Sequence, residues 1–195
     1  MKIILAITII VLSYNCRAQK TNGIIIIENI IPVEKHINYL ENEIEIYDNS
    51  YFKDVNDKLT SFEGTWIGNY DNKAYEIQIE RYTYISSIRP LKIDKLSIKY
   101  KITDAQNNIL INTLNFSNDD TLTLNGNYFL SNEETYQVNY VGYECTHAGN
   151  LFMATFNAGT QMNLIMIPDS ERRCSQTEQA PQIFPINQKM ILTKQ

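Results

Sequence analysis

Few residues of this chain could carry out acid–base or nucleophilic chemistry, and they are scattered. His36 and His147 are the two histidines, and neither stands beside a nucleophile or a second ligand in a known motif. The chain has no Gly-x-Ser-x-Gly string of serine hydrolases and no His-Glu-x-x-His string of zinc proteases. We therefore expect both histidines to be solvated loop residues, and the sequence predicts no enzyme, no metal site and no cofactor.

Two acidic pairs and the cysteines complete the reactive residues. Asp119-Asp120 and Glu133-Glu134 fall where turns are expected, so we interpret them as solvated turn residues and not as a catalytic dyad. Cys16 lies in a predicted export signal, which leaves Cys145 and Cys174 as an even pair. In an oxidising compartment such a pair is expected to form a disulfide.

Tyrosine is the other chemistry-bearing residue type, with 13 copies. Several tyrosines occur at alternate positions of strand-like segments, on the parity that the sequence assigns to the buried face. Core packing is the favoured role, but in a hollow interior the same side chains would line an amphipathic pocket. The tyrosines in question are Tyr75, Tyr100, Tyr128, Tyr136 and Tyr140.

The elements that would position these side chains are short strands. Apolar residues alternate with polar ones at positions 75–80 and, most regularly, at 96–102. Tyr82 and Tyr84 have the opposite parity, which predicts a bulge or a strand end near Glu80-Arg81. The predicted strands cover 65–70, 75–80, 96–102, 109–116, 121–130, 135–143, 150–156, 160–167 and 189–193.

Short turns between these strands favour one architecture. Neighbours in sequence become neighbours in space, so we predict an all-β fold: an antiparallel up-and-down meander β-barrel of about eight to nine strands. A barrel of this size is filled by side chains or holds one small ligand. Residues 62–195 form this domain, and residues 19–61 form an entry segment that packs on it.

Within the entry segment, two local patterns carry predictions. Asp54 is placed to cap a helical turn at residues 54–59. Glu43 and Glu45 alternate with Ile44 and Ile46, which favours an edge strand with one solvated face over a cation site.

The first 18 residues are typical of a signal peptide. Lys2 precedes an apolar stretch at residues 3–12, and Ala18 ends a small-x-small cleavage signal, so Gln19 would begin the mature chain. This predicts an exported protein, periplasmic or extracellular, with no transmembrane segment. The alternative is an outer-membrane lipoprotein modified at Cys16, although Ser13 and Asn15 depart from the usual lipidation signal.

The net charge of the chain argues against two classes of partner. The net charge is −5 at pH 7, and loss of Lys2 and Arg17 with the signal would make the chain more acidic. No basic block offsets this balance, so the sequence argues against binding of nucleic acid or anionic lipid.

The Gly64-x-Trp66 motif after a short helical turn resembles the opening signature of the lipocalin/calycin superfamily. Nearly the whole mature chain resembles an uncharacterised family of secreted bacterial lipocalin-like proteins, a domain of unknown function. The matching stretches are Ala18-Gln19, residues 51–56 leading into residues 62–66, the late cysteines and residues 191–194.

This resemblance implies a role for Trp66 as the plug of the closed end of a barrel, with Gly64 allowing close approach. Lipocalins also place an arginine of the last strand against that tryptophan, and this chain offers only Lys189 and Lys194 there.

Two functions follow as expectations. The first is a binding module that holds a small apolar or amphipathic ligand in the barrel. The alternative is a structural or protein-interaction module of the cell envelope with a filled core. Nothing in the sequence specifies an oligomeric state.

Overall fold

The structure is a computed structural model that describes residues 27–141, 147–171 and 182–195. The predicted signal peptide, Cys16 and the Cys145–Cys174 disulfide therefore lie outside the described residues. Among the helices described, none has the length and apolar character needed to cross a membrane.

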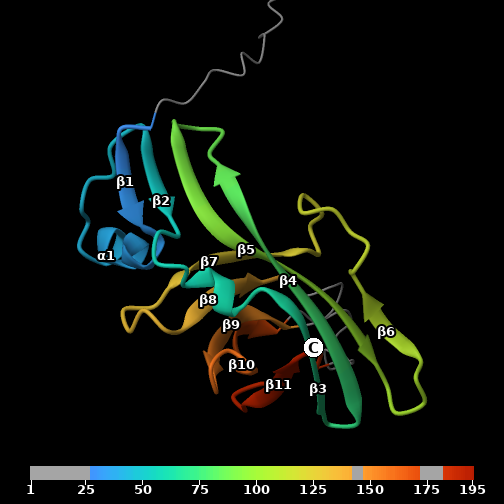
Figure 1. The fold of residues 1–195 in the computed structure, drawn as a ribbon. Helices are drawn as coiled ribbons and strands as arrows, with labels where there is room; N and C mark the ends of the chain where they lie inside the picture. Colours follow the sequence, from blue (N-terminus) through green and yellow to red (C-terminus); the bar gives the residue numbers. More distant parts are fainter. Residues whose placement is uncertain (1–26, 142–146, 172–181) are drawn as a thin grey trace, which may run out of the picture.

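Eight strands of the described residues close into an antiparallel barrel, which confirms the predicted fold class. Their order around the barrel is β5-β4-β3-β11-β10-β9-β8-β7, and pairing of β7 with β5 closes the ring. Apart from β6, consecutive strands are neighbours, as in a meander (Figure 1). The strands are β3 (Gly64–Tyr70), β4 (Lys73–Ile85), β5 (Leu91–Thr103), β7 (Leu124–Phe129), β8 (Tyr136–Tyr140), β9 (His147–Phe156), β10 (Gln161–Glu171) and β11 (Met190–Lys194).

The long strand β5 joins the barrel to the elements outside it. One edge of β5 pairs with β4 along its length. The other edge pairs in succession with β2 (Ser50–Lys53), with β7 and with β6 (Ile109–Asn112). In Figure 1, β2 and β6 accordingly lie beside opposite ends of β5.

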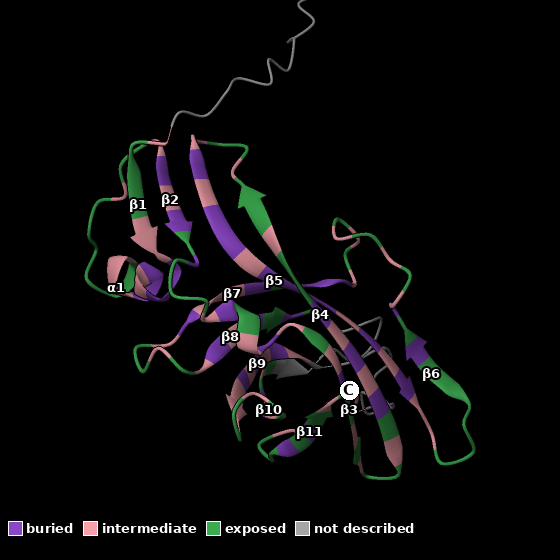
Figure 2. Ribbon diagram, viewed as in Figure 1, coloured by how far each residue is buried: buried purple, intermediate pink, exposed green. Residues whose placement is uncertain are grey.

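The predicted bulge or strand end near Glu80-Arg81 is wrong. β4 continues to Ile85 with an unbroken register against β5. What changes is the buried face, because Leu91 and Ile93 are buried at one end of β5 whereas Leu96 and Ile98, on the other parity, are buried inside the barrel (Figure 2). The pair of strands extends beyond the barrel, where its opposite face becomes covered.

The entry segment forms a small layer on this extension. β1 (Asn29–Pro32) and β2 add to β5 as parallel strands. Two short helices follow β1, η1 (Val33–Lys35) and α1 (His36–Glu41), and the Phe52 ring of β2 packs against rings of α1. The edge strand predicted around Ile44 and Ile46 is wrong, since these residues follow α1 in a non-strand segment.

The closed end of the barrel consists of the 3-10 helix η2 (Leu59–Ser61), Phe62 and Trp66. Asp54 accepts hydrogen bonds from the backbone N–H groups of Lys58 and Leu59 at 2.7 and 3.1 Å, but the helical turn predicted at residues 54–59 is wrong, because the helix begins only at Leu59 and Lys58 is its N-cap. Phe62 packs on the rings of Phe129 and Tyr136, from strands on the far side of the barrel.

Trp66 is fully buried, and its Nε1 donates to the backbone oxygen of Phe62 at 2.7 Å. Lys194 of β11 pairs with Trp66 across the strands, and its Nζ lies 5.3 Å from the centroid of the ring. Gly64 has a φ of 122°, which strains any L residue, and a Cβ there would lie 3.0 Å from the Lys194 side chain. The entry segment, β3 and β11 therefore meet at the ring of Trp66.

Trp66→Ala should lower the free energy of unfolding by about 3–5 kcal/mol, because it removes a fully packed ring and one buried hydrogen bond. Urea denaturation would measure this cost. Ile67→Ala is the matched control, since its side chain is 42% exposed on the outer face of the same strand and should cost under about 1 kcal/mol. Equal losses in the two variants would contradict the role of Trp66 as a plug.

Candidate functional site

Three of the tyrosines predicted from the sequence meet at the end of the barrel opposite Trp66. Tyr75, Tyr100 and Tyr140 come from β4, β5 and β8, are at most 3% exposed, and surround the ring of Phe184. The centroid of Phe184 lies 6.1 Å from that of Tyr75, 5.2 Å from Tyr100 and 5.3 Å from Tyr140. We call these three residues the tyrosine cage and this end of the barrel its mouth.

Phe184 enters the mouth from the segment that leads into β11. Tyr75 donates its hydroxyl to the backbone oxygen of Ile183 at 2.8 Å, beside the caged ring. Burial raises the pKa of Tyr75 and of Tyr100 above the usual tyrosine range, and the neighbouring Tyr140 raises that of Tyr100 further. The hydroxyls of these two residues are therefore held protonated, able to donate a hydrogen bond.

The sequence patterns did not identify Phe184. Its signal is the apolar stretch Ile183-Phe184-Pro185-Ile186 inside a polar, proline-containing connection. Four apolar residues in a loop indicate that the loop packs against an apolar surface of the protein, but the sequence does not identify that surface.

Tyr136 lies deeper, fully buried near the closed end, against Phe62 and Phe129. Its hydroxyl accepts a hydrogen bond from the backbone N–H of Leu96 at 3.3 Å, and burial raises its pKa. It is separate from the tyrosine cage.

Tyr128 departs from its predicted inward parity. The register of β7 against β8 shifts between Gly126 and Tyr128, so the strand bulges and Phe129 takes the inward position instead. Tyr128 lies partly exposed outside the barrel, with its ring centroid 6.3 Å from that of His36. It therefore does not line a pocket in the interior.

A second cluster of polar side chains lies at the closed end. Arg81 Nη1 is 3.1 Å from Asp54 Oδ2, and its Nε is 3.1 Å from Glu63 Oε1. Asp94 accepts hydrogen bonds from the hydroxyls of Tyr51 and Thr83 at 2.7 and 2.8 Å. It also accepts one from the backbone N–H of Asp54 at 3.0 Å, which links the entry segment to the barrel wall.

The hydrogen bonds of this cluster join the entry segment to the barrel. Both oxygens of Asp54 and both of Asp94 already accept hydrogen bonds from fixed protein donors. Burial raises the pKa of Asp54 above its usual value, and the N–H groups of Leu59 and Lys58, together with Arg81, offset only part of this rise. No group of three or more His, Cys, Asp or Glu residues in the described part of the chain could hold a metal ion.

The remaining candidates for catalysis have other roles. Asp120 accepts from the backbone N–H of Leu122 at 2.9 Å in a turn, and Glu133 pairs with Lys35 of the entry segment. The expectation of a solvated His36 is wrong, because the residue is only 7% exposed and its ring centroid lies 4.4 Å from that of Phe52. The side chain of His147 lies outside the described residues.

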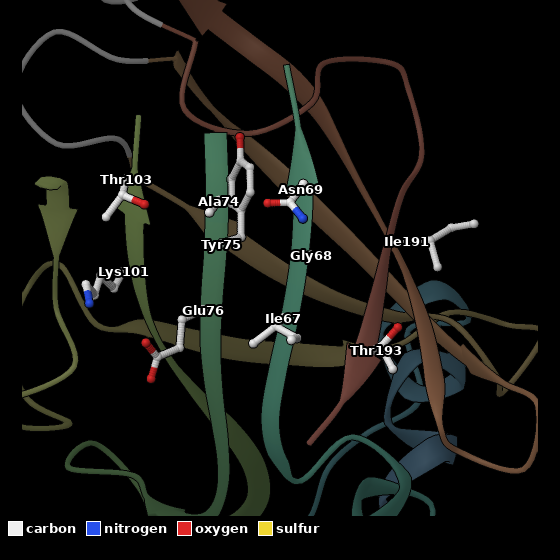
Figure 3. Close-up of a pocket in the computed structure, with 10 residues that line it drawn as sticks. All are labelled: Ile67, Gly68, Asn69, Ala74, Tyr75, Glu76, Lys101, Thr103, Ile191 and Thr193. Atoms are coloured by element: carbon white, nitrogen blue, oxygen red, sulfur yellow. The ribbon is translucent and has the colours of Figure 1, made fainter. Parts of the chain in front are cut away.

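A hollow of about 780 Å³ lies on the outer face of β11, β3, β4 and β5 (Figure 3). Cross-strand rows of outward side chains line it, with Ile67 beside Glu76 and Glu76 beside Lys101. The hollow mixes one acid, one base, and small polar and aliphatic groups on a flat sheet. Tyr75 is the buried residue among those that line the hollow, and its ring belongs to the tyrosine cage, so we take the cage as the candidate site.

The comparisons with known proteins identify no relative. No protein-family model, curated protein or solved structure matches this chain. The assignment of the candidate site therefore depends on the geometry of the site alone.

Tyr75→Phe should lower the free energy of unfolding by about 1–3 kcal/mol, because it leaves the Ile183 carbonyl at the mouth without its donor. Tyr70→Phe is the matched control, since Tyr70 donates to Gln188 of the same segment at the exposed surface and should cost under about 0.5 kcal/mol. Chemical denaturation of the two variants tests this. A larger loss for Tyr70→Phe would show that the segment is held from outside and not through the cage.

Stability should also depend on the protonation of His36. Burial, with a smaller effect of nearby Lys95, lowers its pKa from 6.5 to about 4, so the folded state favours the neutral ring. The contribution of the neutral His36 ring to the free energy of unfolding is fully present above pH 6.5. It is lost progressively as the pH falls towards 4, by at most about 3 kcal/mol. His36→Phe should flatten this part of the stability profile, and a constant difference between variant and wild type from pH 7 to 4 would contradict it.

Proposed function

We propose that this protein binds a small apolar or amphipathic ligand at the mouth of its barrel, within the tyrosine cage. One observation carries the proposal: three buried tyrosines hold one aromatic ring that arrives from a connecting segment and not from the barrel wall. Aromatic walls with a few polar groups are typical of small-molecule sites. The cage supplies both, because the Tyr75 hydroxyl already donates to a carbonyl beside the ring.

In this state Phe184 occupies the site itself. A ligand must displace it, and burial of a phenylalanine side chain is worth about 1.5–3 kcal/mol. The apparent affinity of the wild-type protein is then reduced by the fraction of molecules in which the cage is free. Phe184 is thus a competitor for the site as well as a part of the core.

The second candidate function is a protein-interaction module of the cell envelope with a filled core. The presence of Phe184 inside the barrel also favours this alternative, because the side chains of the described interior form one continuous cluster. The two candidates differ in whether the cage accepts a free molecule once Phe184 is removed.

Export of the protein belongs to the same proposal. Its support is the signal-like stretch of residues 1–18, with a lipoprotein anchored through Cys16 as the alternative. The described strands support a Cys145–Cys174 disulfide, because His147 and Glu171 are cross-strand partners and each cysteine lies within three residues of one of them.

Phe184→Ala should create a cavity that binds aryl compounds of the size of p-cresol, since engineered apolar cavities of about 150 Å³ bind benzene. The variant itself should lose about 3–5 kcal/mol of stability. A probe at 100 times its dissociation constant should restore about 2.7 kcal/mol, measured as a rise in melting temperature. Wild-type protein should show a much smaller rise.

Phe129→Ala is the matched control, because Phe129 is equally buried but packs near the closed end. Its melting temperature should respond less to p-cresol than that of Phe184→Ala. An equal response would mean that any core cavity fills non-specifically, and a folded Phe184→Ala variant that binds no aryl probe would favour the interaction module.

A further inference from the structure

The segment that carries Phe184 is bound to the barrel in the way that an extended peptide binds a sheet edge. β11 begins only at Met190, opposite Leu164, so β10 has an edge beyond that point which β11 does not cover. Ile186 pairs there with Met166 as a parallel bridge. The N–H of Met166 donates to the oxygen of Pro185 at 3.0 Å, and the N–H of Asn187 donates to the oxygen of Met166 at 2.9 Å.

Side chains add selectivity to these main-chain bonds. Phe184 fills the tyrosine cage, and the Tyr75 hydroxyl binds the carbonyl of the residue before it. Pro185, the next residue, is buried, and Ile186 packs partly buried against the core. Edge pairing that gives affinity, together with a pocket for one side chain that gives specificity, is the general pattern of peptide recognition by strand addition.

Contacts beyond this stretch are weaker. Asn187, Gln188 and Lys189 are exposed, and Gln188 accepts a surface hydrogen bond from the Tyr70 hydroxyl. Two main-chain hydrogen bonds, one tyrosine hydroxyl and one ring therefore anchor residues 183–187. A second peptide that offers the same four interactions could replace them, although a tethered segment competes at an effective concentration in the millimolar range.

We infer that the mouth is a peptide site, and that its ligand is an extended apolar peptide with an aromatic side chain for the cage and a main chain for the edge of β10. Residues 183–187 act as the built-in occupant and show the chemistry of the ligand: an aliphatic residue, the aromatic ring, then proline and another aliphatic residue. This inference rests on the proposed function, since it names the ligand class for the same site.

The test uses the full mature chain with Phe184→Ala and an acetylated, amidated peptide of residues 182–188, Gln-Ile-Phe-Pro-Ile-Asn-Gln. Titration calorimetry should show binding about tenfold tighter than for the same peptide with alanine in place of phenylalanine. It should also be about tenfold tighter than binding to wild-type protein, in which the cage is occupied. If the alanine peptide binds as tightly, the peptide inference is wrong.

A second substitution separates the peptide from a simple aryl ligand. Adding Tyr75→Phe to Phe184→Ala should weaken the peptide several-fold, because it removes the donor to the main-chain carbonyl, but it should leave binding of toluene unchanged. Equal effects on peptide and toluene would contradict recognition of the main chain.

The outcomes also separate the inference from the proposed function. If p-cresol stabilises Phe184→Ala and the peptide does not bind, the cage takes small molecules and the peptide inference fails alone. If neither binds to a folded variant, both fail. Should Phe184→Ala not fold, Phe184→Leu keeps most of the buried volume and is expected to show the same order of affinities with smaller ratios.

Discussion

The hydrogen-bonded ladder between β4 and β5 is the constraint on which the rest of the structure depends. Its register runs without a break from Ala74 and Thr103 to Ile85 and Lys92, across the barrel and beyond it. With one edge committed to β4, β5 has a single free edge, which β2, β7 and β6 divide among themselves. The barrel closes only where β7 meets this edge, so its position on β5 also sets where the entry layer attaches.

The chain fills its own barrel from both ends with residues that are not part of its wall. At the closed end, Phe62 follows η2 and reaches the rings of Phe129 and Tyr136. At the mouth, Phe184 enters from the segment before β11. Both rings arrive on short connecting segments held by few hydrogen bonds, so the interior depends on segments that a regular sheet does not hold in place.

The polar cluster around Arg81 differs from the tyrosine cage in its structural role. Asp54 and Asp94 are buried, but their oxygens are satisfied by N–H and hydroxyl donors from η2, β2 and β4. A buried carboxylate without such partners would cost several kcal/mol. The cluster therefore joins the entry segment to the barrel, whereas at the mouth the Tyr75 hydroxyl holds the segment that carries Phe184.

Sequence alone determined most strands of the barrel, the closed meander and the buried parity of residues 75–79 and 96–102, because alternation and turn residues such as Asp71 and Asn72, both at positive φ, act between near neighbours. It also indicated Trp66 and Gly64. It did not predict β2, and it placed the end of β6 at residue 116 instead of Asn112. Only the tertiary structure decided that Tyr128 points outward, that β4 continues past Arg81, and that Phe184 enters the tyrosine cage. Each of these depends on which distant segment covers a face or an edge, and no local pattern encodes a partner that lies far away in the chain.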